Sequence, residues 1–304
     1  MDNLIKVAEG FHFLEGPRWH ENKLWFSDMH GYKVHNLDVD GNLSTLAEIP
    51  EQPSGLGWLP DGSLIIVSML DRKLMKLKDG ELSIHADMSH LTPYQCNDMV
   101  IAKDGTAYVG NFGTDSIESK IHKTCLISVT QEGETKICAD GLLFPNGTVI
   151  SPDGKELIVG ETFGGNLTSF QINESGELSH RTIWARVMPL HFKIITSIIR
   201  FLNIPLKESN STPFPVPDGI CLDSDNGIWV ASPTTAEVIR YKKGGKITDR
   251  IATPQPAYAC MLGGKDEKEL YILTAESSNP QFCKENKTGE IYKVEVDYER
   301  AGEP

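Results

Sequence analysis

Residues 60–68 read Pro60-Asp61-Gly62-Ser63-Leu64-Ile65-Ile66-Val67-Ser68, a turn followed at once by a short apolar run. The Asp-Gly pair tolerates the positive φ of a tight hairpin turn, and a β-branched run with a small final residue is typical of a buried strand. Similar apolar runs occur six times, and most of them follow an Asp-Gly or Asn-Gly turn. They begin at residues 24, 64, 107, 157, 228 and 270.

The spacing of these runs predicts the fold. Successive runs lie 40, 43, 50, 71 and 42 residues apart, and a period of about 40–45 residues with four strands per repeat is typical of a β-propeller blade. A β-solenoid would have a shorter repeat, and a parallel α/β fold would need helical patterns that are almost absent. We therefore predict an all-β, six-bladed propeller that forms a single domain over residues 1–304. Leu4–Val7 and Ile291–Val296 would share one blade and close the ring.

Composition excludes several classes of partner. The chain has 29 Lys and Arg against 42 Asp and Glu, a net charge of −13. Because a phosphate backbone requires clustered basic residues, we expect no nucleic-acid partner, and no membrane partner either. The sequence has neither a long apolar span nor the basic and apolar regions of a signal peptide. We expect a cytoplasmic protein that acts on a small molecule.

One position in the repeat carries polar side chains in nearly every blade. It lies about ten residues before each apolar run, where the chain would enter the innermost strand of a blade. Equivalent positions in a propeller face the same end of the central channel, so these six side chains should converge there. We call them the polar ring: Glu15, Ser54, Asn97, Asn146, Asp218 and Tyr258.

The chemistry of the polar ring suggests a metal site. Two carboxylates held close together are unfavourable unless a cation or a shared proton compensates. Carboxylate and amide oxygens suit a hard divalent ion, calcium first, and leave Mg²⁺, Mn²⁺, Zn²⁺ and Fe²⁺ open. A single Asn-Gly or Asp-Gly pair is more often just a turn, but four such residues at matched places favour a metal.

Four short motifs resemble those of a known family. They are Leu14-Glu15-Gly16-Pro17-Arg18-Trp19, Cys96-Asn97-Asp98, Phe144-Pro145-Asn146-Gly147 and Pro217-Asp218-Gly219-Ile220. In this order and at these intervals they make essentially the whole chain similar to the SMP-30/gluconolactonase/luciferin-regenerating-enzyme group of six-bladed propellers. The resemblance implies hydrolysis of a lactone with one catalytic divalent cation on the channel axis.

The resemblance also implies roles for individual residues. Glu15, Asn146 and Asp218 match the family's metal ligands, and Asp218 also matches the residue usually proposed as general base. Asn97 matches an asparagine that contacts the substrate. The metal would polarise the lactone carbonyl, while Asp218 either takes the proton from the attacking water or only orients a water that the metal acidifies.

The chain departs from the family at Gln95, where sugar-lactone members often carry an arginine. The loss of that donor suggests a substrate less polar than a sugar lactone. We expect Gln95 to lie in the substrate pocket, together with Asn111, which follows the third apolar run. Two alternative functions stay open: a metal-dependent phosphotriesterase-type hydrolase on the same site, and a calcium-binding propeller without catalysis.

The spacing of 71 marks an insertion over about residues 187–212. Apolar residues recur with helical spacing through Leu190–Leu202, which predicts an amphipathic helix. Because the insertion ends shortly before Asp218, we interpret it as a lid over the site. The alternatives are a helix packed on the rim and a contact between subunits of a homo-oligomer.

Overall fold

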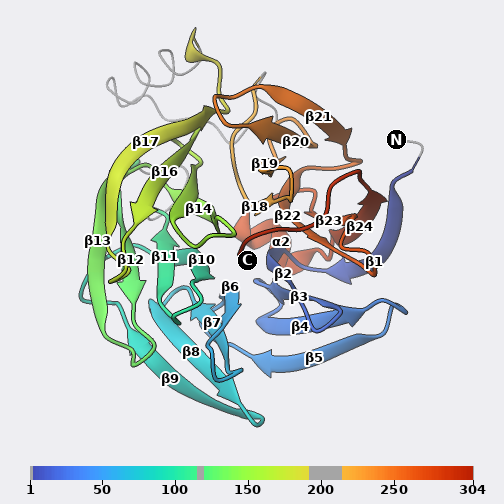
Figure 1. Ribbon diagram of the computed structural model, residues 1–304. Helices are drawn as coiled ribbons and strands as arrows, with labels where there is room; N and C mark the ends of the chain where they lie inside the picture. The colour runs from blue at the N-terminus through green and yellow to red at the C-terminus, as the bar shows by residue number, and fades with distance from the viewer. Residues whose placement is uncertain (1–2, 115–119, 192–213, 304) are drawn as a thin grey trace.

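The computed structural model describes residues 3–114, 120–191 and 214–303. Their strands form six four-stranded sheets, set around a common axis like the blades of a propeller (Figure 1). The predicted six-bladed, all-β fold is confirmed.

In blades 1 to 3, four antiparallel strands follow one another in sequence order from the channel outward (Figure 1). Blade 1 consists of β2 (Leu14–His20), β3 (Lys23–Asp28), β4 (Lys33–Asp38) and β5 (Leu43–Glu48). Blade 2 consists of β6 (Pro53–Trp58), β7 (Leu64–Ser68), β8 (Lys73–Lys78) and β9 (Glu81–Asp87). Blade 3 consists of β10 (Cys96–Ile101), β11 (Ala107–Asn111), β12 (Thr124–Val129) and β13 (Thr135–Leu142).

Blades 4 and 5 repeat this order, whereas blade 6 takes its outermost strand from the N-terminus. Blade 4 consists of β14 (Pro145–Ile150), β15 (Glu156–Glu161), β16 (Asn166–Ile172) and β17 (Leu178–Arg186). Blade 5 consists of β18 (Ile220–Leu222), β19 (Gly227–Ser232), β20 (Glu237–Lys242) and β21 (Ile247–Ala252). Blade 6 consists of β22 (Ala257–Gly263), β23 (Glu269–Thr274), β24 (Gly289–Glu295) and β1 (Ile5–Phe11).

The apolar runs of the sequence become the second strand of each blade. These strands are buried almost throughout, as in β7 and β19, because each blade packs its faces against its two neighbours. Packing between blades includes a stacked pair, Trp19 of blade 1 and Tyr271 of blade 6, with ring centroids 5.5 Å apart. The core therefore lies between blades and leaves the inner strands to line the channel.

Blade 6 closes the ring. β1 pairs antiparallel with β24, with Ile5 opposite Lys293 and Phe11 opposite Gly289 (Figure 1). This confirms the predicted sharing of one blade by the two ends of the sequence.

After β24, the C-terminal tail, residues 296–303, crosses the end of the channel opposite the polar ring. Ile150, the last residue of β14, exchanges two backbone hydrogen bonds with Glu303, of 2.6 and 3.0 Å. Ala301 N donates to Leu222 O at the end of β18, at 3.1 Å. The chain terminus consequently lies near the centre of the ring (Figure 1). The tail covers one mouth of the channel and leaves the other to the polar ring.

Helical structure is minor. The sequence analysis did not identify α2 (Pro280–Glu285), which begins after the N-cap Asn279 with a proline in its first turn. Leu190 and His191 are helical, but the rest of the expected insertion helix lies in 192–213, outside the described residues. The lid thus stays a prediction. In the parts of the chain that the structure describes, no helix is long and apolar enough to span a membrane.

Candidate active site

The six residues of the polar ring occupy matching places in the six blades. Five of them are the second residue of an innermost strand, and Asp218 lies two residues before β18. All are buried, with exposed fractions between 0% for Ser54 and 8% for Asp218. The alignment of the sequence repeats therefore located one level of the channel correctly.

Glycines let the inner strands approach closely at this level. A Cβ on Gly147 would lie 2.5 Å from Ile220 N, and one on Gly16 would lie 2.5 Å from Ser54 O. Both distances are well inside van der Waals contact, so a side chain at either place would push two blades apart. The glycine after a ring residue is thus a packing requirement, and it draws the polar side chains together.

A chain of hydrogen bonds runs around the ring from blade 2 to blade 5. Asn97 Oδ1 accepts from Ser54 Oγ at 3.3 Å, and Asn97 Nδ2 donates to Asn146 Oδ1 at 3.0 Å. Asn146 Nδ2 then donates to Asp218 Oδ1 at 2.5 Å. Each amide nitrogen donates to the next residue, so this series of hydrogen bonds ends at the Asp218 carboxylate, which accepts the last one.

The two carboxylates of the ring resist ionisation. Burial raises the pKa of Asp218 to about 8, against the opposing hydrogen bond from Asn146, and the charge of Asp98 adds to the rise. Burial also raises the pKa of Glu15 well above its usual range, and repulsion from Asp218 and Asp98 reinforces the effect. Within the described residues, neither carboxylate forms an ion pair with a basic side chain. The ring therefore favours a bound proton or a bound cation.

Below the ring lies a buried ion pair between residues of two of the family motifs. Arg18 Nη2 is 2.7 Å from Asp98 Oδ1, and both side chains are almost fully buried. Arg18 also donates to Leu56 O at 2.9 Å and to Pro17 O at 2.7 Å. Arg18 is thus occupied by blades 1 to 3 and is not a counter-ion for Glu15.

Thr162 is a residue that sequence reasoning missed. Its Oγ1 accepts from Asn146 Nδ2 at 3.1 Å and donates to Pro217 O at 2.8 Å. It connects blades 4 and 5 behind the ring and holds the Asn146 amide. The available signal was its place after the fourth apolar run, which corresponds to that of Phe112 after the third.

The three residues expected to bind substrate differ in their position relative to the polar ring. Asn97 belongs to the ring itself. Gln95 is half-buried just before β10, where its carbonyl accepts from Phe112 N at 3.0 Å. Asn111 is fully buried, and its amide is engaged by β12, with Nδ2 donating to Cys125 O at 2.9 Å and Oδ1 accepting from Thr124. The structure does not bring Asn111 into the ring, so its contact with substrate stays a prediction.

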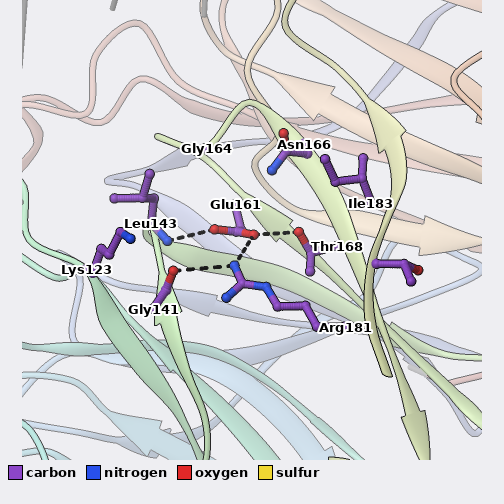
Figure 2. A pocket seen from close by; sticks show the side chains of 10 residues that line it. Lys123, Gly141, Leu143, Glu161, Gly164, Asn166, Thr168, Arg181 and Ile183 are labelled. Atoms are coloured by element: carbon purple, nitrogen blue, oxygen red, sulfur yellow. Dashed lines mark hydrogen bonds and ion pairs between the residues drawn. The ribbon is translucent and has the colours of Figure 1, made fainter. Parts of the chain in front are cut away.

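A cavity of about 390 Å³ lies between blades 3 and 4, outside the polar ring (Figure 2). Its buried acid, Glu161, accepts from Leu143 N at 2.8 Å and is 3.0 Å from Arg181 Nη2. Thr168 donates to the same carboxylate. Because Glu161 has a full set of partners, it stabilises the contact between the two blades and is not comparable with Glu15 or Asp218.

No described group of three or more His, Cys, Asp or Glu side chains could hold a metal ion. A cation at the ring would therefore depend on two carboxylates supplemented by amide oxygens, a donor set that suits calcium better than zinc.

The sequence profile described as SMP-30/Gluconolactonase/LRE-like region matches residues 13–276 of the chain. The protein belongs to this family. The match begins just before Glu15 and continues past Tyr258, so it contains the whole polar ring.

Individual relatives are consistent with this family membership. A pentonolactonase of Haloferax volcanii is 24% identical over 266 residues, which cover 86% of this chain and 81% of the relative. Regucalcin of Pongo abelii is 21% identical over 309 residues, covering 92% and 89%.

Solved structures of the family share the fold. A calcium-binding regucalcin of Agrobacterium tumefaciens superimposes with a TM-score of 0.76 at 17% identity, covering 99% of this chain and 96% of that one. A gluconolactonase of Xanthomonas campestris superimposes with a TM-score of 0.72 at 21% identity, covering 96% and 89%.

Proposed function

We propose that the protein is a metal-dependent hydrolase that opens a lactone by adding water at the polar ring. The observation that carries this proposal is the pair of buried carboxylates, Glu15 and Asp218, that have no basic partner among the described side chains. Membership of a family with relatives named pentonolactonase and gluconolactonase supports the assignment to the lactonases.

The donor atoms of the ring fit a divalent cation. Glu15, Asn146 and Asp218 would hold it, and a calcium-binding relative with the same fold makes Ca²⁺ the first ion to test. The Glu15 carboxylate is held in place only lightly, by Gly16 N at 3.3 Å. Asn146 Oδ1 accepts one hydrogen bond from Asn97 and keeps a second lone pair for a ligand. The bound ion would supply Lewis-acid polarisation of the lactone carbonyl.

The protein's own groups would orient substrate and move a proton. Asp218 lies at the end of the amide chain, and its raised pKa means that its carboxylate holds a proton strongly in this environment. In the metal-free protein this carboxylate is more basic than an exposed aspartate, but a bound cation would lower its pKa. Asp218 would therefore either take the proton from the attacking water or orient a water that the cation acidifies. Asn97 would hold the lactone, since its amide faces the ring beside Asn146.

The test is hydrolysis of sugar, aliphatic and aromatic lactones after removal of metal and restoration with single ions. We expect activity to disappear on exhaustive chelation and to return with Ca²⁺. Full activity after chelation would contradict the proposal. Binding of Ca²⁺ without turnover of any lactone or phosphotriester would instead indicate a calcium-binding propeller.

An Asp218→Asn variant separates the two roles of Asp218. Retained Ca²⁺ binding with lost turnover would support a base, because an amide can still donate an oxygen to the ion but cannot accept the proton of water. Unchanged turnover would exclude Asp218 as the base. Calorimetric titration with Ca²⁺, run beside the lactone assay, distinguishes these outcomes.

A further inference from the structure

Three phenylalanines form a continuous aromatic surface beside the polar ring. Phe112 stacks on Phe144 with ring centroids 4.5 Å apart and an interplanar angle of 27°. Phe144 contacts Phe163 at 5.2 Å and 50°. Phe144 is buried, whereas Phe112 and Phe163 are half-buried, so the surface has two partly accessible rings around a covered one. We call this set the aromatic wall.

The backbone ties the aromatic wall to the ring. Phe144 precedes the Pro145-Asn146 pair, and its carbonyl accepts from Thr162 N at 3.0 Å. Phe163 follows Thr162, whose hydroxyl holds the Asn146 amide. The three phenyl groups thus come from the ends of blades 3 and 4 that face the ring, next to one of the candidate metal ligands.

The aromatic character of the wall is not a requirement of the backbone. Phe144 has a φ of +55°, a left-handed conformation that is uncommon for a bulky residue and is found more often at functional sites. Gln52 occupies the equivalent place in blade 2, before Pro53, with a φ of +66°. Its side chain bonds His30 Nδ1 at 3.0 Å. The same backbone conformation therefore accepts a polar amide side chain in blade 2. The conformation alone does not explain why blade 4 has a phenyl group at this position.

We propose that the aromatic wall binds an alkyl or aryl substituent on the lactone ring, which makes substituted aliphatic lactones the substrate class of this enzyme. The inference rests on the proposed function, because it assumes that the lactone carbonyl lies at the polar ring. A bare lactone or a sugar lactone would leave the accessible parts of the two half-buried rings in contact with water. A hydrocarbon substituent would cover these parts, and each methylene fully buried would tighten binding about fourfold.

Binding of lactams tests the wall without relying on hydrolysis. Piperidin-2-one and 6-pentylpiperidin-2-one reproduce an unsubstituted and a substituted δ-lactone but resist ring opening. We expect the pentyl compound to bind the unchanged, Ca²⁺-loaded protein at least about tenfold more tightly by calorimetric titration, since even two buried methylenes suffice for that ratio.

Variants locate the effect. Phe112→Ala and Phe163→Ala should each reduce the affinity ratio of the two lactams severalfold while leaving the affinity for piperidin-2-one nearly unchanged. Trp58→Ala is the matched control, because Trp58 is also half-buried and aromatic but stacks on His20 at the other end of the inner strands.

Two outcomes would overturn the inference: no preference of the unchanged protein for the pentyl lactam, including no binding of it, and a preference that both phenylalanine variants retain. Hydrolysis of δ-valerolactone and of its pentyl-substituted analogue with Ca²⁺ is measured separately. If that reaction occurs while the lactam ratio is flat, the wall is wrong and the proposed function stands. If the lactam preference is present without any hydrolysis, the proposed function fails instead.

Discussion

Two buried aspartates in blade 5 lie five residues apart and have opposite surroundings. Asp223 is fully buried, and Arg240 approaches it with Nε at 2.6 Å and Nη2 at 3.0 Å. Gly227 N donates to the same carboxylate at 2.8 Å. Asp218 is nearly as buried, but its side chain accepts from the neutral amide of Asn146, and burial raises its pKa to about 8. Arg240 thus neutralises Asp223, whereas no basic side chain within the described residues pairs with Asp218.

The difference between the two aspartates distinguishes a charge that is neutralised within the fold from one that is available to a ligand. Arg240 is itself covered, stacked 3.5 Å above the ring of Tyr298, so the Asp223 pair is complete without solvent or ligand. The Arg18–Asp98 pair below the ring is likewise closed. A protein that provides buried arginines for these acids could provide one for Asp218. Among the described residues Asp218 has no such counter-ion, which supports the proposal that a cation binds at the polar ring.

The largest expected effect comes from removing charge at the ring. Glu15→Gln keeps the shape of the side chain and removes one negative charge from the candidate metal site. We expect kcat/KM for a hydrolysed lactone to fall by about a thousandfold, since a bound cation contributes several kcal/mol to the transition state. Asp38→Asn, on an exposed turn, is the control. Full activity of Glu15→Gln with added Ca²⁺ would show that Glu15 is not a ligand.

The second-largest effect is expected on the stability of the fold and concerns Asp223. Arg240→Met leaves Asp223 buried without its counter-ion, so the free energy of unfolding should fall by about 3–5 kcal/mol. Urea unfolding measures this loss, and the double variant with Asp223→Asn should recover part of it. The Ca²⁺ affinity of the folded variant should not change. A Ca²⁺ affinity that falls with Arg240→Met would mean that the two aspartates are not independent.

The third effect is the pH dependence of metal binding. Folding raises the pKa of Asp218 from 3.8 to about 8, so between these values the folded protein keeps a proton that the unfolded chain has released. The stability of the metal-free protein should therefore decrease as pH rises from about 4 to about 8. Because Ca²⁺ must displace this proton, its affinity should rise up to about tenfold per pH unit until about pH 8.

Thermal unfolding with and without Ca²⁺ tests whether the Ca²⁺ affinity rises with pH. The increase in Tm that Ca²⁺ produces should be larger at about pH 9 than at about pH 6. An equal increase at both pH values would indicate that Asp218 is already ionised in the metal-free protein. Asp218→Asn should weaken the pH dependence of the metal-free protein, because it removes the contribution of Asp218 and relieves the repulsion that helps to raise the pKa of Glu15, and it provides the internal control.

The smallest effect is expected from the support behind the ring. Thr162→Val keeps the size of the side chain but removes the hydroxyl that accepts from Asn146 and donates to Pro217 O. We expect the Ca²⁺ affinity to fall by about tenfold or less, as for other groups that orient a metal ligand. Thr253→Val is the matched control, because Thr253 is also buried and donates to a carbonyl, that of Gln255. Equal effects of both variants would assign Thr162 a purely structural role.

The fold could be predicted because its signal is repeated. Each apolar run becomes the second strand of a blade, and each ring residue lies at the entrance of an innermost strand, so six weak local patterns support one periodic interpretation. α2 escaped prediction because one short helix has no periodicity of its own. Its only local signals are the Asn279 cap and the following proline.

The candidate site was only partly predictable. Glu15, Asn146 and Asp218 could be found because the repeat aligns them. Thr162 acts on Asn146 through a contact between blades, and Arg18 acts through a pair with Asp98, 80 residues away along the chain. Such contacts depend on the three-dimensional arrangement of the blades. Asn111, expected in the substrate pocket, turns its amide to the neighbouring strand of its own blade, a contact that the sequence pattern does not reveal, and its role in substrate binding stays a prediction.

The shared blade also has a consequence for the order in which the protein can be made. β1 precedes every other strand during synthesis, yet its partner β24 begins only at Gly289. Until then the ribosome holds a chain with five blades, the paired strands β22 and β23, and an unpaired β1, and an unpaired strand edge is a template for association with other chains. Closure joins segments separated by almost the whole sequence, which makes it a slow step. Chaperone protection should therefore matter most for residues 5–11, in the interval before the last strand emerges.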